Sequence, residues 1–475
     1  MNKFFTKSSI LSISLLTVMA SAAISPALAK IKQAFPDVDP TLIKLVLTLP
    51  SLLIIPFSLL AGWLATRMKK KYVLLIGLVI YTIGGIGGAF ARSITELLII
   101  RAFFGIGAGL IIPLSTSLIA DFYEGPERTK MMGLSGSVSH LGGVIFLLVS
   151  GWLACVSWRL AFSVYGLAVI IFLMVLFFLP EPVSKRSGGL VKSALPGGVF
   201  ICAILGALMM VAFYAAPTNL AMFIENERQM YTSQAPLFKD KEEFQASLAT
   251  GMISETTVRS FKANGITISA KANLAVLEPG RSWSITDRNK KYIIHKDNDK
   301  LVIATERLGR PGIAGYYLSS MTIVGVVSGI FLATLAGILG PYFTTIGIAC
   351  MAIGYSLLGS AVSLTSVFIA MLLIGFSSGV LMPILLLRTA RITPDTSRAF
   401  AMAVVSVGIY LGQFISPLVL QAAGKLLPMK DVFRAQFNFL CLGLVVASAV
   451  AFLMAINAVR KGNYKNYLIG AGHPH

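Results

Sequence analysis

The sequence predicts an all-α membrane protein: twelve transmembrane helices in two six-helix repeat halves, with a small α+β insert in the second half. Composition points to the membrane, because 56% of the 475 residues are apolar and only 13% are charged, against about a quarter in soluble domains. Apolar runs long enough to cross about 30 Å of hydrocarbon recur along the chain. The chain also repeats itself, since IIRAFFGIGAGLIIP at 99–113 resembles IAMLLIGFSSGVLMP 270 positions later.

The repeat is preserved without a gap over several helices. The positions related by this one offset are Gly105 and Gly375, Gly109 and Gly379, Pro113 and Pro383, Arg128 and Arg398, and Gly142 and Gly412. Self-similarity on this length scale indicates two structural halves built from one unit. Duplicated membrane bundles with a site between them are typical of secondary transporters.

The apolar runs predict twelve spans and the domain boundaries. The spans are expected near 8–29, 42–65, 72–91, 97–120, 130–151, 158–179, 195–223, 313–337, 341–361, 364–387, 397–422 and 433–458. The expected domains are an N-terminal bundle over 1–180, a cytoplasmic linker over 181–194, a C-terminal bundle over 195–225 and 311–460, an insert over 226–310 and a cytoplasmic tail over 461–475.

The net charge of +20 is explained by topology rather than by nucleic-acid binding. With a cytoplasmic N-terminus, the inside loops hold roughly twice as many Lys and Arg residues as the short outside loops, Lys44 being counted outside. We therefore expect a multi-pass protein of the plasma or inner membrane with both termini in the cytoplasm.

The N-terminal segment and the cysteines each have an alternative interpretation. Residues 1–29 imitate a cleavable signal peptide, but Ser25-Pro26 has a counterpart in Ala216-Pro217 of the seventh span, so we expect the segment to be retained as a helix. The four cysteines lie in or beside spans at no metal or redox spacing, and no metal site is expected.

The insert is hydrophilic and nearly balanced in charge, with 14 Lys/Arg and 11 Asp/Glu between Glu225 and Arg310. Its pattern predicts a small α+β domain on the extracytoplasmic side. Helices are expected over 238–250 and 254–264, and strands over 266–270, 273–278, 282–286, 291–295 and 301–305. Two interpretations stay open: the domain caps the outer mouth of the bundle, or it binds a partner, a wall component or the substrate.

Several local motifs resemble those of the major facilitator superfamily. They are Gly62-Trp-Leu-Ala-Thr66-Arg67-Met-Lys69-Lys70-Lys71, Arg101-x-x-x-Gly105, Glu127-Arg128 with Gly133, and Trp158-Arg159-x-x-Phe162, which recurs as Phe433-Arg434-x-x-Phe437. The resemblance covers everything except the insert and is closest in character to the drug:proton antiporter branch. It implies a twelve-helix transporter that moves a small solute.

The basic loop after the second span places cations at a cytoplasmic helix end, where they meet helix dipoles and anionic lipid. Gly62, Arg67 and Lys71, with Arg128 in the next inner loop, are the candidates for a gating role. The alternative is a loop that only sets topology, because Thr66 stands where the family has an acid.

Arg101 lies within a predicted span, and an ionised side chain there normally faces the bundle interior or a watery cavity. We therefore expect it to line the substrate cavity. Other polar residues expected to line the cavity are Thr17, Ser21, Tyr214, Asn219, Tyr410 and Gln413. Close helix packing is expected at Gly105, Gly109, Gly142, Gly143, Gly375 and Gly379.

No Asp or Glu falls in the interior of a predicted span, so His140 in the fifth span and Glu225 at the end of the seventh are the candidates for proton coupling. The lack of a membrane acid favours neutral or anionic amphiphiles over organic cations.

Without a nucleotide-binding loop, the driving force is expected to be an ion gradient, most simply of protons. The leading hypothesis is proton-coupled efflux of a small amphiphilic solute by alternating access. The alternatives are uptake of an organic anion, and a membrane receptor that uses the insert as its sensor. No cofactor, catalytic site or nucleic-acid partner is expected, and the protein is expected to be a monomer in the lipid bilayer.

Overall fold

A computed structural model describes residues 3–181, 195–226, 229–232, 241–250, 252–263, 268, 273–278, 282–287, 290–297, 300–305, 311–361, 364–394, 397–426 and 432–460. The chain divides into two units, a helical one formed by residues 1–221 with 311–475, and a smaller one formed by residues 222–310.

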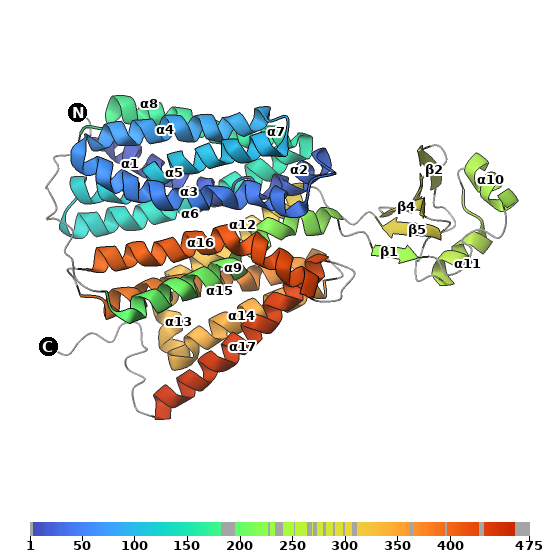
Figure 1. Cartoon of the computed structure of the whole chain (residues 1–475). Coiled ribbons are helices and arrows are strands. Elements are labelled where there is room, and N and C mark those ends of the chain that lie inside the picture. The colour runs from blue at the N-terminus through green and yellow to red at the C-terminus, as the bar shows by residue number, and fades with distance from the viewer. Residues whose placement is uncertain are drawn as a thin grey trace. The chain divides into compact units, whose positions relative to one another are not determined.

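The first half of the helical unit, blue to blue-green in Figure 1, contains six long helical segments. They are α1 (Lys3–Ala22), α3 (Pro40–Arg67), α4 (Lys70–Gly87), α5 (Ile94–Phe122), α6 (Gly125–Val156), and a last segment built of α7 (Trp158–Ala161), the 3-10 turn η3 (Phe162–Gly166) and α8 (Leu167–Phe178). The turn η1 (Ser25–Ala27) and the short α2 (Leu28–Ala34) connect α1 to α3, and the turn η2 (Gly88–Phe90) follows α4.

The second half repeats this order. Its helices are α9 (Gly197–Asn226), α12 (Pro311–Ile330), α13 (Leu332–Leu339), α14 (Phe343–Gly359), α15 (Leu364–Ile392), α16 (Arg398–Leu426) and α17 (Val432–Arg460), with the turn η4 (Gly340–Tyr342) between α13 and α14.

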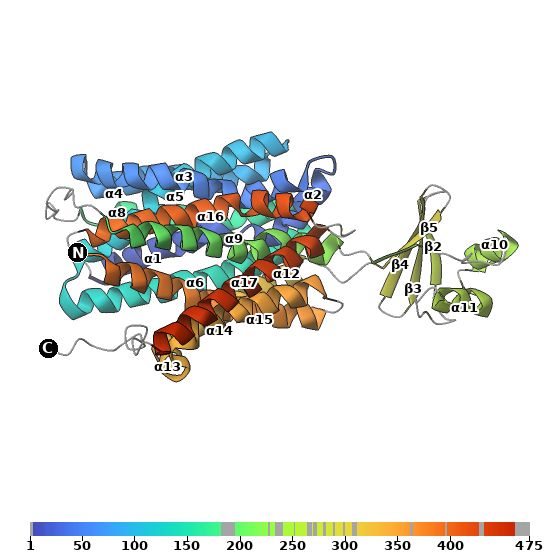
Figure 2. The same ribbon diagram turned by 60° about the horizontal axis from the view of Figure 1, so that its bottom comes forward.

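Packing follows the sequence repeat. The helix α5 packs on α3 and α4 in the first half, as its counterpart α15 packs on α12 and α14 in the second. The halves meet along two helix pairs, α3 with α16 and α6 with α12 (Figures 1 and 2). The 270-residue offset of the repeat exchanges these two pairs, so the interface has the pseudo-two-fold relation expected of duplicated bundles.

Eleven described helical segments are long and apolar enough to cross a membrane. The helix α1 is not among them, although it packs against α5, α6 and α8 and buries Ile10, Ile13, Leu16 and Met19 completely. The spacing of three residues between these side chains gives one buried stripe along the helix.

Several expected boundaries are wrong by part of a helix. The helix expected over 8–29 ends at Ala22, because Pro26 lacks the N–H that a continuing helix would need. The helix expected over 313–337 breaks at Phe331, and Gly340, with a φ of +55°, makes the turn into α14. The helix expected over 130–151 begins earlier, at Gly125, whose φ of +56° separates α5 from α6.

The smaller unit is a five-stranded antiparallel sheet with two helices on one side of it (Figures 1 and 2). Its strands are β1 (Gln229–Thr232), β2 (Asn273–Glu278), β3 (Ser282–Asp287), β4 (Lys290–Asp297) and β5 (Lys300–Thr305), in the order β1-β5-β4-β3-β2. The helices are α10 (Lys241–Thr250) and α11 (Glu255–Ala263).

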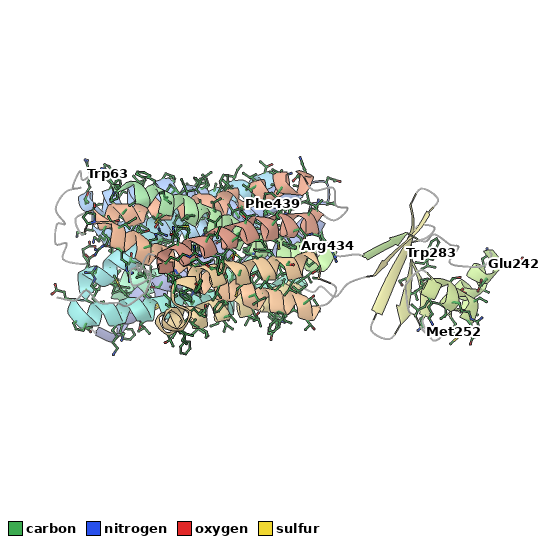
Figure 3. The ribbon with its side chains drawn as sticks, turned by 90° about the horizontal axis from the view of Figure 1, so that it is seen from below. Trp63, Glu242, Met252, Trp283, Arg434 and Phe439 are labelled. Carbon is green, nitrogen blue, oxygen red and sulfur yellow. The ribbon has the colours of Figure 1, made fainter. Side chains whose placement is uncertain are left out.

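The core of this unit lies between α11 and the strands β2 and β3. Leu274 pairs with Ile285 across these strands, and both are buried, as are Ile253 and Phe261. Trp283 stands on β3 near this cluster (Figure 3). The sequence did not predict β1, and the strand expected over 266–270 falls almost entirely outside the described residues.

Candidate functional site

The interface between the two halves is bonded near the middle of its helices. Ser51 on α3 donates to the Gln413 side-chain oxygen on α16 at 2.8 Å. In the related pair, Ser319 on α12 donates to the backbone carbonyl of Val144 on α6 at 3.1 Å. Each contact joins the first half to the second, so both belong to the interface of the two halves.

From this level the contacts continue to one end of the bundle, the end at which α3 and α12 begin. There Ser25 donates to the Pro217 carbonyl, and the Gln421 side chain donates to Asp39 at 3.3 Å. The Gly312 N–H points to the Cys155 sulfur at 3.4 Å. We call this the closed end.

Lys44 is the charged residue inside the closed end. It lies on α3, is 3% exposed, donates to the Gln436 side-chain oxygen at 3.3 Å and stands 5.2 Å from the centre of the Phe433 ring. The Lys44 ammonium thus contacts a side-chain amide and the face of an aromatic ring, both from α17 of the other half. Sequence reasoning counted Lys44 with the loop cations and missed this role, although a lysine inside an apolar helix was a signal for it.

Asp39 caps the first turn of α3 at this end. Its carboxylate accepts the Thr41 N–H at 2.7 Å, and the bonds to Thr41, with weaker attraction from Lys425 and Lys32, lower the pKa of Asp39. A charged cap at a helix N-terminus also benefits from the helix dipole.

Beyond the middle of the bundle, α6 and α12 both carry exposed side chains. His140 lies one turn from Val144 on α6 and is exposed, and Ile323 lies one turn from Ser319 on α12 and is 48% exposed.

Two polar groups expected in the cavity lie in the interior of the bundle. Gln413 is buried between α3 and α9, and its amide nitrogen points to the Met210 sulfur at 3.7 Å. Asn219 on α9 is fully buried, and neither its amide nitrogen nor its oxygen has a hydrogen-bond partner among the described residues. An amide that is buried without a partner is ready to bind a ligand or water.

The other residues expected to line the cavity differ in their burial and bonding. Thr17 donates back to the Ser14 carbonyl of its own helix at 2.8 Å. Tyr214 is buried on α9, and Tyr410 is half-buried on α16. The side chains of Ser21 and Glu225 fall outside the described residues.

Arg101 is completely buried inside the first half. Its Nε donates to the Val46 carbonyl at 2.9 Å, and one terminal nitrogen donates to the Tyr165 hydroxyl at 3.3 Å. The guanidinium also stacks 4.2 Å from the centre of the Phe104 ring. The other terminal nitrogen has no partner among the described residues.

The acceptor of Arg101 is explained by a proline. Val46 stands four residues before Pro50 in α3, so its carbonyl lacks the N–H that an α-helix would supply. Arg101 donates to this freed carbonyl, and Gly105, one turn later, packs against Pro50, with only 2.7 Å between its hypothetical Cβ and the Pro50 carbonyl oxygen. Arg101 and Gly105 therefore fit α5 to the proline site of α3.

The glycines expected at helix contacts lie there wherever the structure describes their surroundings. A Cβ on Gly109 would meet Phe57 at 2.8 Å, and one on Gly142 would meet Leu15. In the second half, a Cβ on Gly375 or Gly379 would collide with the backbone of α12. Gly143 is buried on α6.

The basic loop is tied to its own half. Lys70 forms an ion pair with Asp121 at 2.6 Å, and Lys71 donates to the Leu176 carbonyl at 2.9 Å. Arg67 stacks on Trp63, which lies at the end of the bundle opposite Arg434 (Figure 3). Gly62 has open space around it and Arg128 is exposed.

The repeated Arg motif has the same role in both halves. Arg159 donates to the Ala91 carbonyl after α4 at 3.1 Å, and Arg434 donates to the Ala361 carbonyl after α14 at 2.9 Å. The two carbonyls are related by the 270-residue offset of the repeat. Each arginine thus joins the start of the last segment of its half to the end of the third.

A family model of the Major Facilitator Superfamily matches residues 10–254, more than half of the chain. The chain belongs to this superfamily. The D-xylose-proton symporter, a solved structure, has the same fold, with a TM-score of 0.61 and 17% identity over 94% of this chain and 97% of the symporter.

Two curated relatives from the superfamily are similar over shorter stretches. The multidrug transporter protein MdtP of Bacillus subtilis is 30% identical over 118 residues, which are 24% of this chain and 22% of MdtP. The quinolone resistance protein NorA of Staphylococcus aureus is 28% identical over 145 residues, which are 30% of this chain and 37% of NorA. The matches thus span less than two fifths of either relative.

Proposed function

We propose that this superfamily member is a secondary active transporter that exports a small amphiphilic organic solute in exchange for protons. The observation that carries the proposal is the interface of the two repeat halves, which hydrogen bonds between described residues join from the middle of the bundle to the closed end. Halves of this kind alternate access by rocking around a site near the midplane. The similarity to MdtP and NorA supports drug-like substrates.

We further propose that all twelve spans, α1 included, cross the membrane, with both termini cytoplasmic. The closed end is then extracytoplasmic, and the structure corresponds to an inward-facing state. The excess of Lys and Arg in the loops at the opposite end supports this orientation. The insert over 226–310 follows α9 and would be extracytoplasmic.

The proposed site extends from the middle of the bundle, at Gln413, to the closed end, where Asn219 lies two residues beyond Pro217 on α9. Gln413 and the unpartnered Asn219 amide supply hydrogen-bonding groups, and Tyr214 and Tyr410 supply aromatic surface. His140, exposed on α6 beyond the middle of the bundle, is the first candidate for proton coupling, and Glu225 is the second. Histidine is the side chain whose ordinary pKa lies closest to neutral pH, so a small change of environment can make it take up or release a proton.

Transport is tested in proteoliposomes that carry an imposed pH gradient. Purified protein should accumulate a fluorescent quinolone only when the lumen is acidic, and His140→Gln should leave binding of the quinolone intact while removing its pH dependence. Accumulation that is indifferent to the gradient would contradict proton coupling. If no compound of a broad amphiphile library is moved, the transport proposal fails.

Orientation is tested separately, by labelling single cysteines on intact cells with an impermeant reagent. A cysteine at Asp297 should react and one at Lys70 should be protected. The reverse result would invert the topology and leave the transport proposal intact.

A further inference from the structure

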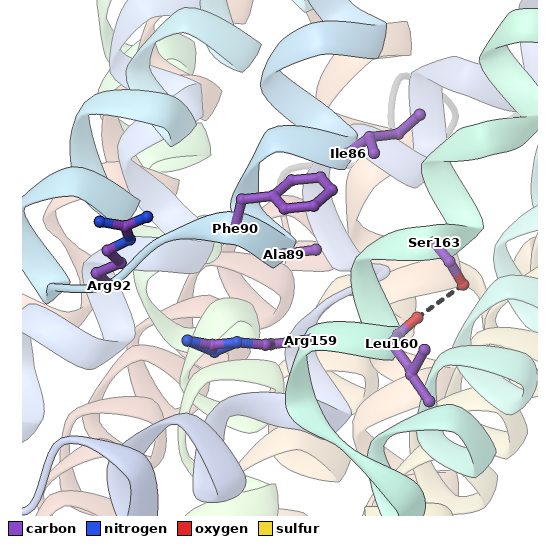
Figure 4. Close-up of a pocket in the computed structure, with 7 residues that line it drawn as sticks. All are labelled: Ile86, Ala89, Phe90, Arg92, Arg159, Leu160 and Ser163. Atoms are coloured by element: carbon purple, nitrogen blue, oxygen red, sulfur yellow. Dashed lines mark hydrogen bonds between the residues drawn. The ribbon is translucent and has the colours of Figure 1, made fainter.

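A pocket of about 590 Å³ opens on the surface of the first half, at the same end as Lys44. It lies between the end of α4 with the turn η2 on one side and α7 with η3 on the other (Figure 4). Its lining is Ile86, Ala89, Phe90, Arg92, Arg159, Leu160 and Ser163. Two arginines thus stand in a pocket whose other lining residues are apolar, apart from Ser163.

The two arginines are available to an anion in different ways. Arg159 is held in place, because it donates to the Ala91 carbonyl at 3.1 Å and stacks 4.4 Å from the centre of the Trp158 ring. The Arg92 guanidinium is exposed and has no hydrogen-bond or ion-pair partner within the described part of the chain. The nearby Glu96 carboxylate accepts the backbone N–H of Arg92 at 2.7 Å and is not in the lining.

An exposed apolar stripe leads to this pocket along α4. It consists of Ile76, Val79, Ile83 and Phe90, of which Ile83 is 66% and Phe90 76% exposed. The adjacent α8 exposes Ile170, Leu173 and Phe177. Both helices belong to candidate membrane spans, Lys70–Phe90 and Trp158–Phe178, and the pocket lies where the first ends and the second begins. At the end of a span a pocket is within reach of lipid headgroups, and exposed apolar side chains along the span are within reach of acyl chains.

We propose that this pocket binds the phosphate of an anionic phospholipid, with the acyl chains lying along α4 and α8. Paired guanidinium groups bind phosphate through charge-assisted hydrogen bonds. The apolar stripe supplies the contact that distinguishes a lipid from a soluble phosphate. The site depends on the membrane position of α4 and α8, and not on whether the protein transports or in which direction.

The repeat provides a matched control in the other half. Arg434 makes the same bond as Arg159, to the Ala361 carbonyl. However, the sequence has Val362 at the position of Arg92 and Ser360 at the position of Phe90. The second half therefore keeps the structural arginine and lacks both the second cation and the apolar wall.

The test is a titration of the full-length, delipidated protein in detergent micelles with dioleoyl phosphatidylglycerol, followed by native mass spectrometry. The wild type should bind this lipid more tightly than dioleoyl phosphatidylcholine. Arg92→Ala and Arg159→Ala should each weaken binding about fivefold, and the double variant about 25-fold, by the usual contribution of one arginine near anionic lipid. Arg434→Ala should bind phosphatidylglycerol like the wild type.

Two results would overturn the proposal. One is unchanged phosphatidylglycerol affinity of Arg92→Ala, which alters an exposed side chain and should fold normally. The other is binding of glycerol 3-phosphate as tight as that of the lipid, because the pocket would then be a soluble-anion site. If Arg159→Ala does not fold, Arg92→Ala and Arg92→Glu decide the question, and the second should abolish the preference for phosphatidylglycerol.

Discussion

At the scale of single residues, Arg101 shows how one proline determines the place of a buried charge. Pro50 leaves the Val46 carbonyl without its helical donor, and Arg101 supplies that donor from α5. An unsatisfied buried acceptor destabilises a protein by about 1–3 kcal/mol. The aromatic rings of Phe104 and Tyr165 then surround the guanidinium.

We therefore expect Arg101→Ala to destabilise the protein, and Pro50→Ala to offset part of that loss. Alanine at position 50 restores an N–H to the Val46 carbonyl, so the double variant should be more stable than the sum of the single effects by about 1 kcal/mol. Thermal unfolding in detergent measures the cycle. The control is Pro56→Ala, whose freed carbonyl is that of Leu52, and its effect should add to that of Arg101→Ala. If Arg101→Ala showed the same coupling energy with Pro56→Ala as with Pro50→Ala, Arg101 would not act as the donor to the Val46 carbonyl.

Asp39 gives a prediction about pH. Its folded-state pKa is depressed below the ordinary value of 3.8, so its charge stabilises the protein above that pH, and the contribution is lost as the pH falls through the folded-state pKa. Asp39→Asn keeps the cap but removes the charge, and should lower stability by a few tenths to about 1 kcal/mol at neutral pH. The difference in melting temperature should shrink below pH 3.8. A melting-temperature difference that stays the same below pH 3.8 would show that the charge of Asp39 is not responsible.

At the scale of helices, the repeated glycines set the distance between α5 and α3 and between α15 and α12. A Cβ on Gly379 would lie 2.0 Å from the Gly325 carbonyl oxygen, closer than any helix pair can tolerate. In the first half, a Cβ on Gly105, the counterpart of Gly375, would lie 2.7 Å from the Pro50 carbonyl oxygen of α3. Small residues of this kind let helix backbones approach in a membrane.

Gly379→Ala should consequently destabilise the second half by about 1–3 kcal/mol, because α12 and α15 must move apart. The matched control is Gly443→Ala on α17, where no atom lies within 4 Å of the added Cβ. That variant should be neutral or slightly stabilising, since glycine is a poor helix former. Chemical denaturation followed by fluorescence compares the two, and a similar loss for both would mean that close approach of α12 is not the reason.

At the scale of the whole molecule, the closed end provides a cross-link that needs only one substitution. A Cβ on Gly312 of α12 would lie 3.5 Å from the Cys155 sulfur on α6, close to the geometry of a disulfide. Gly312→Cys should form this bond under mild oxidation, seen as a mobility shift that reductant reverses and that Cys155→Ser removes. The bond fixes the two halves together at this end, so transport should stop when it forms and return on reduction. Transport that continues through the oxidised protein would show that this interface does not open.

The sequence was enough to predict the features that depend on local pattern. Hydropathy located the helices, the repeat paired Gly105 with Gly375, and helix-packing glycines were recognised because their spacing alone specifies one face of a helix. Gln413 was predicted to line the substrate cavity, and this stays a prediction, although the side chain is buried in the bundle. The helix ends at Ala22 and Ile330 were missed by several residues, since apolar composition continues across both breaks.

Only the tertiary structure decided which half each interior group belongs to and what it bonds. Nothing local in the sequence connects Arg101 to a carbonyl 55 residues away, or Lys44 to Gln436 at the opposite end of the chain. Such contacts arise when helices from distant segments pack, and the carbonyls involved are backbone atoms that carry no residue signal. For the same reason, the sequence could predict two related halves, while the end at which they close depended on how the packed helices meet.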